Sequence, residues 1–217
     1  MQWRKYFKRL PLRILLLMLL FVAALFLFTL IVHEVLSENE QEFDNQVFHF
    51  FYNYIIAPGL TPLMKFFTFM GSVPIQITIY LGLLFFYFFI KKQKSTAWDI
   101  ITIGVSGLLL TVLLKDIFQR ARPVNPLINS AFGYSFPSGH ASTSFILYGL
   151  LTYLIAKENI SVLIKYILAI VLISLSLVIG FSRIYLRVHY ASDVLAGFCT
   201  GYAWLFISVS LLKYFRK

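Results

Sequence analysis

The residues of this sequence that could do chemistry fall in three short clusters, all in the second half of the 217-residue chain. The clusters hold Lys115, Asp116, Arg120 and Arg122; then Pro137-Ser138-Gly139-His140; then Arg183, Arg187, His189 and Asp193. Lysine and arginine bind anions, and the planar fork of a guanidinium suits phosphate oxygens. Histidine adds groups that transfer protons near neutral pH. The combination predicts a site for an oxyanion.

The tetrapeptide from Pro137 to His140 directly precedes an apolar stretch and is typical of a helix start. Serine is a good N-cap, and glycine lets a ligand approach the backbone closely. Unpaired amides and the positive end of the helix dipole then favour an anion. The alternative is an ordinary capped helix with no ligand.

His189 and Asp193 stand four residues apart, which on a helix places them on one face. The carboxylate can then hold one imidazole nitrogen protonated and leave the other with a free lone pair, as a nucleophile or base requires. His140 belongs to another segment and could protonate the leaving oxygen. The alternative is a structural histidine–aspartate hydrogen bond that caps the helix.

A metal site is the obvious competing interpretation of two histidines and an aspartate. Metal phosphatases usually gather several carboxylates, whereas the clusters offer only Asp116 and Asp193 beside three strong cations, Lys115, Arg122 and Arg183. These cations already neutralise a phosphate, so we expect neither a metal nor another cofactor. The lone cysteine, Cys199, cannot form an internal disulfide.

The composition shows which elements must position these clusters. Hydrophobic residues make up 59% of the chain and charged residues 13%, about half the share usual in soluble domains. This excludes a disordered chain and an ordinary soluble enzyme. Six stretches are apolar enough to approach the roughly 20 residues that span a bilayer. They are residues 12–32, 73–90, 95–114, 141–156, 161–181 and 194–212. We therefore predict an all-α, six-span membrane bundle, with five or seven spans as alternatives.

The formal net charge of +10 would suggest nucleic acid in a soluble protein, but here it orients the spans. Basic residues precede the first stretch, follow the second and end the chain, whereas the segment after the first stretch is acidic. By the positive-inside rule both termini face the cytoplasm, and all three clusters lie on the extracytoplasmic side. We interpret the first stretch as a retained anchor, because its apolar run is longer than that of a typical signal peptide.

The aromatic segment 43–71 has nearly helical spacing of its apolar residues and predicts a helix lying in the outer interface. Alternatively it simply packs on the bundle. No internal repeat or linker is evident, so residues 1–217 form a single predicted domain, with its signature region at 115–193.

Together the clusters resemble the three-part signature of the type 2 phosphatidic acid phosphatase superfamily. The matching parts are Lys115 with Arg122-Pro123; Pro137-Ser138-Gly139-His140; and Ser182-Arg183 with His189 and Asp193. The resemblance covers about residues 95–217. It implies that His189 is the nucleophile, that Asp193 orients it and that His140 is the acid. It also implies a phosphate cradle of Lys115, Arg122, Ser138, Gly139 and Arg183. Arg120, Arg187, Ser182, Tyr185 and Tyr190 are not expected to take part.

The implied function is that of a metal-independent membrane lipid phosphatase acting through a phosphohistidine. Candidate substrates are polyprenyl diphosphates, phosphatidylglycerol phosphate, phosphatidate and lipid A phosphates. We expect the aromatic segment to influence the preference for lipid chain length. We expect a multi-pass protein of the plasma (inner) membrane, whose partners are its lipid substrate and the bilayer, not nucleic acid. The alternatives are a lipid phosphotransferase with the same site, a vanadate-dependent haloperoxidase, and a non-catalytic membrane binding or transport protein.

Overall fold

The computed structural model describes residues 12–37, 41–128 and 132–215, and within them the side chain of Arg13 is left out. Several charged residues behind the orientation argument lie outside the described residues. They are Arg4, Lys5, Lys8, Arg9, Glu38, Glu40, Arg216 and Lys217.

Every predicted apolar stretch forms a helix, as expected for chain that must satisfy its backbone hydrogen bonds internally in lipid. The long helices are α2 (Leu12–Val32), α5 (Val73–Phe85), α6 (Lys94–Phe118), α7 (Gly139–Lys157), α8 (Val162–Tyr185) and α9 (Ala191–Phe215). Two of them continue as π-helical turns, α2 into η1 (His33–Ser37) and α5 into η3 (Phe86–Ile90). No strand occurs in the described ranges, which confirms the all-α class.

Five of these helices are long and apolar enough to cross a bilayer: the segments Ile14–Val35, Val73–Ile90, Lys94–Phe118, Val162–Tyr185 and Ala191–Phe215. The sixth predicted span is α7, which carries Ser142, Ser144 and Gly149 among its buried residues. Its neighbours are α6, α8 and α9. Because it faces protein and not lipid, α7 needs less apolar surface than an outer helix. The chain is a multi-pass membrane bundle, and the count of six stays a prediction.

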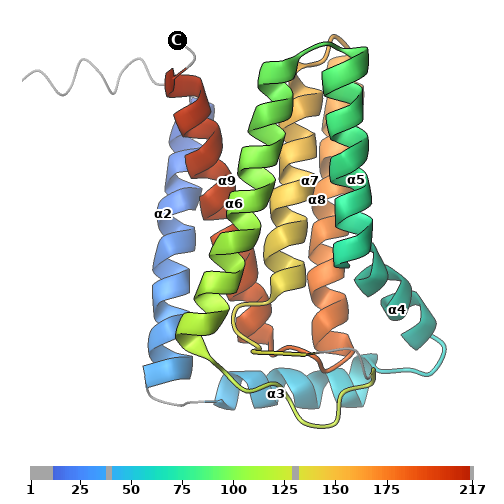
Figure 1. Cartoon of the computed structure of the whole chain (residues 1–217). Helices are drawn as coiled ribbons and strands as arrows, with labels where there is room; N and C mark the ends of the chain where they lie inside the picture. The colour runs from blue at the N-terminus through green and yellow to red at the C-terminus, as the bar shows by residue number, and fades with distance from the viewer. Residues whose placement is uncertain (1–11, 38–40, 129–131, 216–217) are drawn as a thin grey trace, which may run out of the picture.

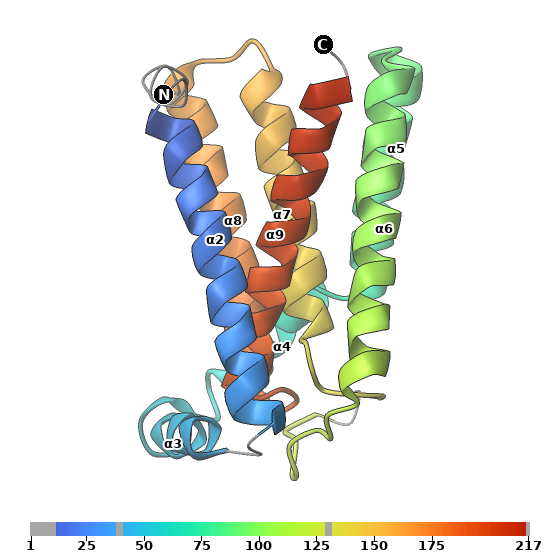
Figure 2. The same ribbon diagram turned by 90° about the vertical axis from the view of Figure 1, so that its left-hand side faces the viewer.

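The long helices lie side by side, and the segment between α2 and α5 closes one end of the bundle (Figures 1 and 2). That segment forms α3 (Glu42–Phe50), which continues into η2 (Phe51–Ile55), and α4 (Thr61–Met70). The α6–α7 and α8–α9 connections reach the same end, whereas the start of α2 and the end of α9 lie at the other. All three polar clusters therefore arrive beside α3 and α4.

Small residues let α9 approach the central helix α7 closely. A Cβ at Gly197 would lie 2.7 Å from the carbonyl oxygen of Ser138, and one at Gly201 would lie 2.8 Å from that of Ser142. Such approach is typical of helix packing in membranes. Here it sets the start of α7 against the first turns of α9.

Candidate active site

Hydrogen bonds to backbone carbonyls tie the three clusters into one site. The amide of Ser138, at the start of α7, donates to the carbonyl of Asp193 in α9 at 2.9 Å. The amide of Ser135 donates to the carbonyl of Arg120 at 2.8 Å. The guanidinium of Arg122 donates to the carbonyl of Val188 at 2.7 Å. Residues far apart in sequence are thus fixed to one another by main-chain contacts.

His189 and Asp193 lie together, although only Asp193 is in the helix. α9 begins at Ala191, so His189 belongs to the connection before it. Nδ1 of His189 is nevertheless 3.4 Å from Oδ2 of Asp193. The backbone amide of Tyr190 donates to the same oxygen at 2.9 Å and so bends the connection around the carboxylate. Both side chains are buried, with 2% and 0% exposed.

Two further side chains hold the Asp193 carboxylate. The hydroxyl of Ser135 donates to Oδ2 of Asp193, and its oxygen lies 3.3 Å from Nδ1 of His189. Arg120 donates from Nη1 to Oδ1 of Asp193 at 2.7 Å. The sequence predicted no role in the site for Arg120, and Ser135 belongs to no predicted cluster. Each contacts the histidine–aspartate pair directly.

The cations Arg122 and Lys115 are held by carbonyls of the loop before α7. Arg122 donates to Gly133 at 2.8 Å and to Phe132 at 2.9 Å. Lys115 donates from Nζ to the carbonyl of Tyr134 at 2.7 Å. Nη1 of Arg122 also lies 3.1 Å from Nε2 of His189. The loop thus fixes both cations, and of the two Arg122 lies beside the imidazole of His189.

Ser138 and Arg183 each present a buried donor with no partner in the described part of the chain. Ser138 occupies the predicted N-cap position of α7, but its side chain makes no capping hydrogen bond. The prediction that this side chain caps the helix is therefore wrong, and Oγ of Ser138 has no hydrogen-bond partner in the described part of the chain. Arg183 donates from Nη1 to Oγ1 of Thr68 at 2.6 Å, while its Nε is unpartnered. Buried donors without partners are rare and favour a ligand at the site.

His140 lies in the first turn of α7 and is half-buried. A Cβ at Gly71 would approach its Cδ2 to 3.1 Å, so the end of α4 packs closely against the ring. His140 interacts electrostatically with Arg183, His189, Arg122 and Lys115, so both histidines lie among the same charges. The first backbone hydrogen bond of α7 runs from Ser142 to Ser138. The amides before Ser142 precede the helical pattern and are suited to bind an anion.

Burial determines the protonation state of His189. The pKa of His189 is lowered from 6.5 to about 3, chiefly by desolvation; the hydrogen bond and charge of Asp193 oppose this shift, and the charges of Arg183 and Arg122 add to it. Burial also lowers the pKa of Arg122, again against Asp193. At neutral pH the imidazole of His189 is therefore uncharged.

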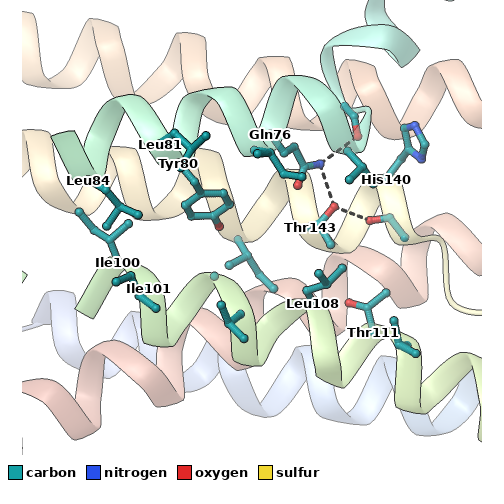
Figure 3. Close-up of a pocket in the computed structure, with 18 of the residues that line it drawn as sticks. Gln76, Tyr80, Leu81, Leu84, Ile100, Ile101, Leu108, Thr111, His140 and Thr143 are labelled. Atoms are coloured by element: carbon teal, nitrogen blue, oxygen red, sulfur yellow. Dashed lines mark hydrogen bonds between the residues drawn. The ribbon is translucent and has the colours of Figure 1, made fainter. Parts of the chain in front are cut away.

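An apolar cavity of about 390 Å³ lies between α5, α6 and α7 and meets the site at one end. Lys115, Gly139 and His140 line that end, and Leu84 and Ile100 line the other. Figure 3 shows this run of side chains, with Gln76 and Thr143 close to His140. The amide nitrogen of Gln76 donates to the carbonyl of Gly71 at 2.9 Å and to Thr143 at 2.8 Å. Several lining residues on the outer edge, such as Leu81 and Leu108, are about half exposed, so the cavity opens between α5 and α6.

The charged hydrogen-bond donors of the predicted cradle around the site, Lys115, Arg122 and Arg183, are all cations. Over the described ranges, no group of three histidine, cysteine, aspartate or glutamate side chains could hold a metal ion. Asp116, the other carboxylate of the clusters, is exposed.

Sequence reasoning missed Asp44, Thr68, Ser135 and the contact of Arg120. Asp44 and Thr68 are buried polar residues, with 1% and 8% exposed, in helices interpreted as interfacial. A carboxylate in an aromatic segment was the available signal for Asp44, because such a charge is seldom buried without a partner. Ser135 and Thr68 carry no comparable signal, since single hydroxyls are common.

The chain is similar to known proteins in sequence and in fold. Residues 96–217 match the family described as the PAP2 superfamily. The chain is 29% identical over 191 residues to phosphatidylglycerophosphatase B of Bacillus subtilis, covering 85% of this chain and 91% of that protein. It is 27% identical over 167 residues to undecaprenyl-diphosphatase of Sulfolobus acidocaldarius, covering 73% of this chain and 74% of that one. The fold resembles the crystal structure of a transmembrane PAP2-type phosphatidylglycerolphosphate phosphatase from Bacillus subtilis, with a TM-score of 0.72 and 24% identity, covering 91% of this chain and 96% of that one.

Proposed function

Because this chain belongs to the PAP2 superfamily, we propose that it is a lipid phosphatase that hydrolyses a phosphomonoester or diphosphate on a membrane lipid. The names of the two relatives above indicate that they act on phosphatidylglycerophosphate and undecaprenyl diphosphate. Each of these lipids carries an anionic headgroup on one or more long apolar chains. The substrate class we propose is what these two share: a terminal phosphate on a membrane lipid.

The observation that carries this proposal is that two donors of the predicted cradle, Oγ of Ser138 and Nε of Arg183, are buried without a partner in the described part of the chain. A buried donor without a partner costs about 1–3 kcal/mol. A phosphate oxygen at each would remove that cost. Lys115, Arg122 and the amide of Gly139 complete a cradle that balances the phosphate charge, so the reaction needs no metal ion.

His189 is the proposed nucleophile. Its Nε2 lone pair attacks phosphorus, the bond from phosphorus to the leaving oxygen breaks, and His140 gives that oxygen a proton. Asp193 stabilises the positive charge that develops on His189 during attack. Water, giving a proton to the deprotonated His140, then attacks the phosphohistidine; the bond from phosphorus to nitrogen breaks, the lone pair returns to His189, and inorganic phosphate is released. Catalysis of this kind rests on position and on the cationic cradle.

The apolar cavity gives the lipid chain a place beside the site. A headgroup at His140 would put its chain along α5 and α6, and the opening between these helices would admit it sideways from the bilayer. With both termini in the cytoplasm, the site faces the extracytoplasmic side of the plasma membrane.

The function is tested with purified protein in detergent and a panel of lipid phosphates, with phosphate release as the readout. We expect wild-type activity that EDTA spares and vanadate inhibits, and no activity in His189→Ala. His49→Ala is the matched control, because His49 is an exposed histidine on α3 at the same end of the bundle. Full activity in His189→Ala would exclude the nucleophile, and loss of activity with EDTA would exclude the metal-independent mechanism.

Transfer to a second lipid is distinguished by comparing free phosphate with phosphorylated acceptor in the same reactions. Sidedness is tested by a reporter inserted within residues 124–136, which we expect to read as extracytoplasmic. A cytoplasmic reading would invert the proposed topology.

A further inference from the structure

Arg120 lies between two buried carboxylates that come from opposite parts of the chain. Its Nη1 donates to Oδ1 of Asp193 at 2.7 Å, and its Nη2 donates to Oδ2 of Asp44 at 2.8 Å. Arg120 is 8% exposed and Asp44 is 1% exposed. The ring of Tyr190 stacks on the guanidinium, with its centroid 4.1 Å from Cζ. The guanidinium is therefore fixed in plane and direction.

Asp44 is the one buried residue of α3 within the described part of the chain. Its Oδ1 accepts the amide of Ser192 at 2.9 Å, and its Oδ2 accepts the hydroxyl of Ser192 at 2.5 Å. Nη1 of Arg120 reaches the same hydroxyl at 2.8 Å. The interfacial helix is thus docked by its carboxylate onto the first turn of α9, directly beside Asp193.

The two oxygens of Asp193 have different partners. Oδ1 accepts from Arg120, whereas Oδ2 faces Ser135, the amide of Tyr190 and Nδ1 of His189. With Oδ1 held, the carboxylate cannot rotate, and Oδ2 is presented to the imidazole. No contact joins Arg120 to His189 or to the unpartnered donors Ser138 and Arg183 in the described structure. Its influence on the reaction therefore passes through Asp193.

We propose that Arg120 and Asp44 are positioning residues that orient the nucleophile His189 through Asp193. This inference rests on the proposed phosphatase function. It also implies that the docking of α3 on the bundle sets the geometry of the histidine–aspartate pair. An ion pair that served only the fold would leave catalysis by the folded protein unchanged.

The test is chemical rescue of Arg120→Ala. We expect kcat to fall by about 100-fold while KM changes less than about 3-fold, because misplacement of a reacting group by about 1 Å can cost that much. Millimolar guanidinium added to this variant should restore a large part of kcat by occupying the vacated space between Asp44 and Asp193. Urea has nearly the same shape but no charge, and it should not restore kcat.

Asp44→Asn is the second variant, and it decides the question if Arg120→Ala does not fold. It keeps the size of the side chain but removes the charge that holds Arg120, and we expect kcat to fall by about 10-fold at unchanged KM. Glu158→Gln is the matched control, since Glu158 pairs with Lys91 at 2.8 Å outside the site and should retain wild-type kcat.

Unchanged kcat in folded Asp44→Asn or Arg120→Ala would overturn the proposal, as would a change confined to KM or equal rescue by urea. Failure of the phosphatase function itself is recognised separately, because wild type and Glu158→Gln would then release no phosphate from any lipid of the panel.

Discussion

Arg122 and His189 meet through Nη1 and Nε2, 3.1 Å apart. A guanidinium can only donate hydrogen bonds, so Nε2 of His189 must be the accepting, unprotonated nitrogen. The proton of the neutral imidazole then lies on Nδ1, next to Asp193 and Ser135. This is the tautomer a nucleophile needs. If Arg122 donated to a phosphate oxygen instead of to His189, the Nε2 lone pair would be free to attack phosphorus.

Stability should depend on pH through His189. Its pKa is lowered from 6.5 to about 3 by burial, so between these values the unfolded chain binds a proton that the folded chain does not. His189 therefore makes no pH-dependent contribution well above pH 6.5, and it destabilises the folded protein progressively as the pH falls towards 3, by up to about 1.4 kcal/mol per pH unit. From about pH 6.5 to 5, wild type should lose about 2 kcal/mol more than His189→Gln. Unfolding in detergent measures this, and equal losses in both proteins would contradict it.

Ser135→Ala should slow catalysis without weakening substrate binding. The Ser135 hydroxyl joins Oδ2 of Asp193 and Nδ1 of His189, and its loss leaves the carboxylate less firmly placed. We expect kcat to fall about 10-fold at unchanged KM, as for one hydrogen bond to a charged group. Ser176→Ala is the control, because the Ser176 hydroxyl donates only to Ile173 of its own helix, at 2.8 Å. A change in KM alone would indicate that Ser135 contacts substrate instead.

The sequence predicted the helices well because their signal is local. An apolar run that must cross lipid has few alternatives to a helix, so the start of α2 at Leu12 and the start of α5 at Val73 were both expected. The main difference concerns α7, whose buried serines make it less apolar than its neighbours. Whether a helix faces lipid or protein depends on tertiary packing, and tertiary packing cannot be inferred from local composition.

The candidate site was predictable where residues stand close in sequence. His189 and Asp193 are four positions apart and do meet, although the helix starts after His189. The partners of Arg120 were not predictable, since Asp44 lies 76 positions away, in α3. Ser138 illustrates a subtler limit: its N-cap position follows from sequence, but the partner of its hydroxyl depends on the surrounding fold.

Gly197→Ala should disturb the site by steric contact. The added Cβ would lie 2.7 Å from the Ser138 carbonyl oxygen and 2.9 Å from Cβ of Ala141, so α7 and α9 must separate. Overpacking of this kind costs about 1–3 kcal/mol, and the displaced Ser138 should also lower activity. Gly82→Ala is the control, because no atom lies within 4 Å of its added Cβ, and it should be neutral or slightly stabilising. Equal stability and activity in both variants would contradict the close packing.

Leu108→Trp should separate long-chain from short-chain substrates. Leu108 lines the apolar cavity, whereas the adjacent Leu109 does not line it and is 62% exposed, so Leu109→Trp is the matched control. An indole in the cavity competes with a lipid chain but leaves the cradle around His189 untouched. We expect kcat/KM for a long-chain lipid phosphate to fall about 10-fold, in the range for excluding a few methylenes, while a short-chain analogue keeps its rate. An unchanged kcat/KM for the long-chain substrate in Leu108→Trp would place the chain elsewhere, for instance along segment 43–71. That result would favour the aromatic segment, and not the cavity, as the determinant of chain length.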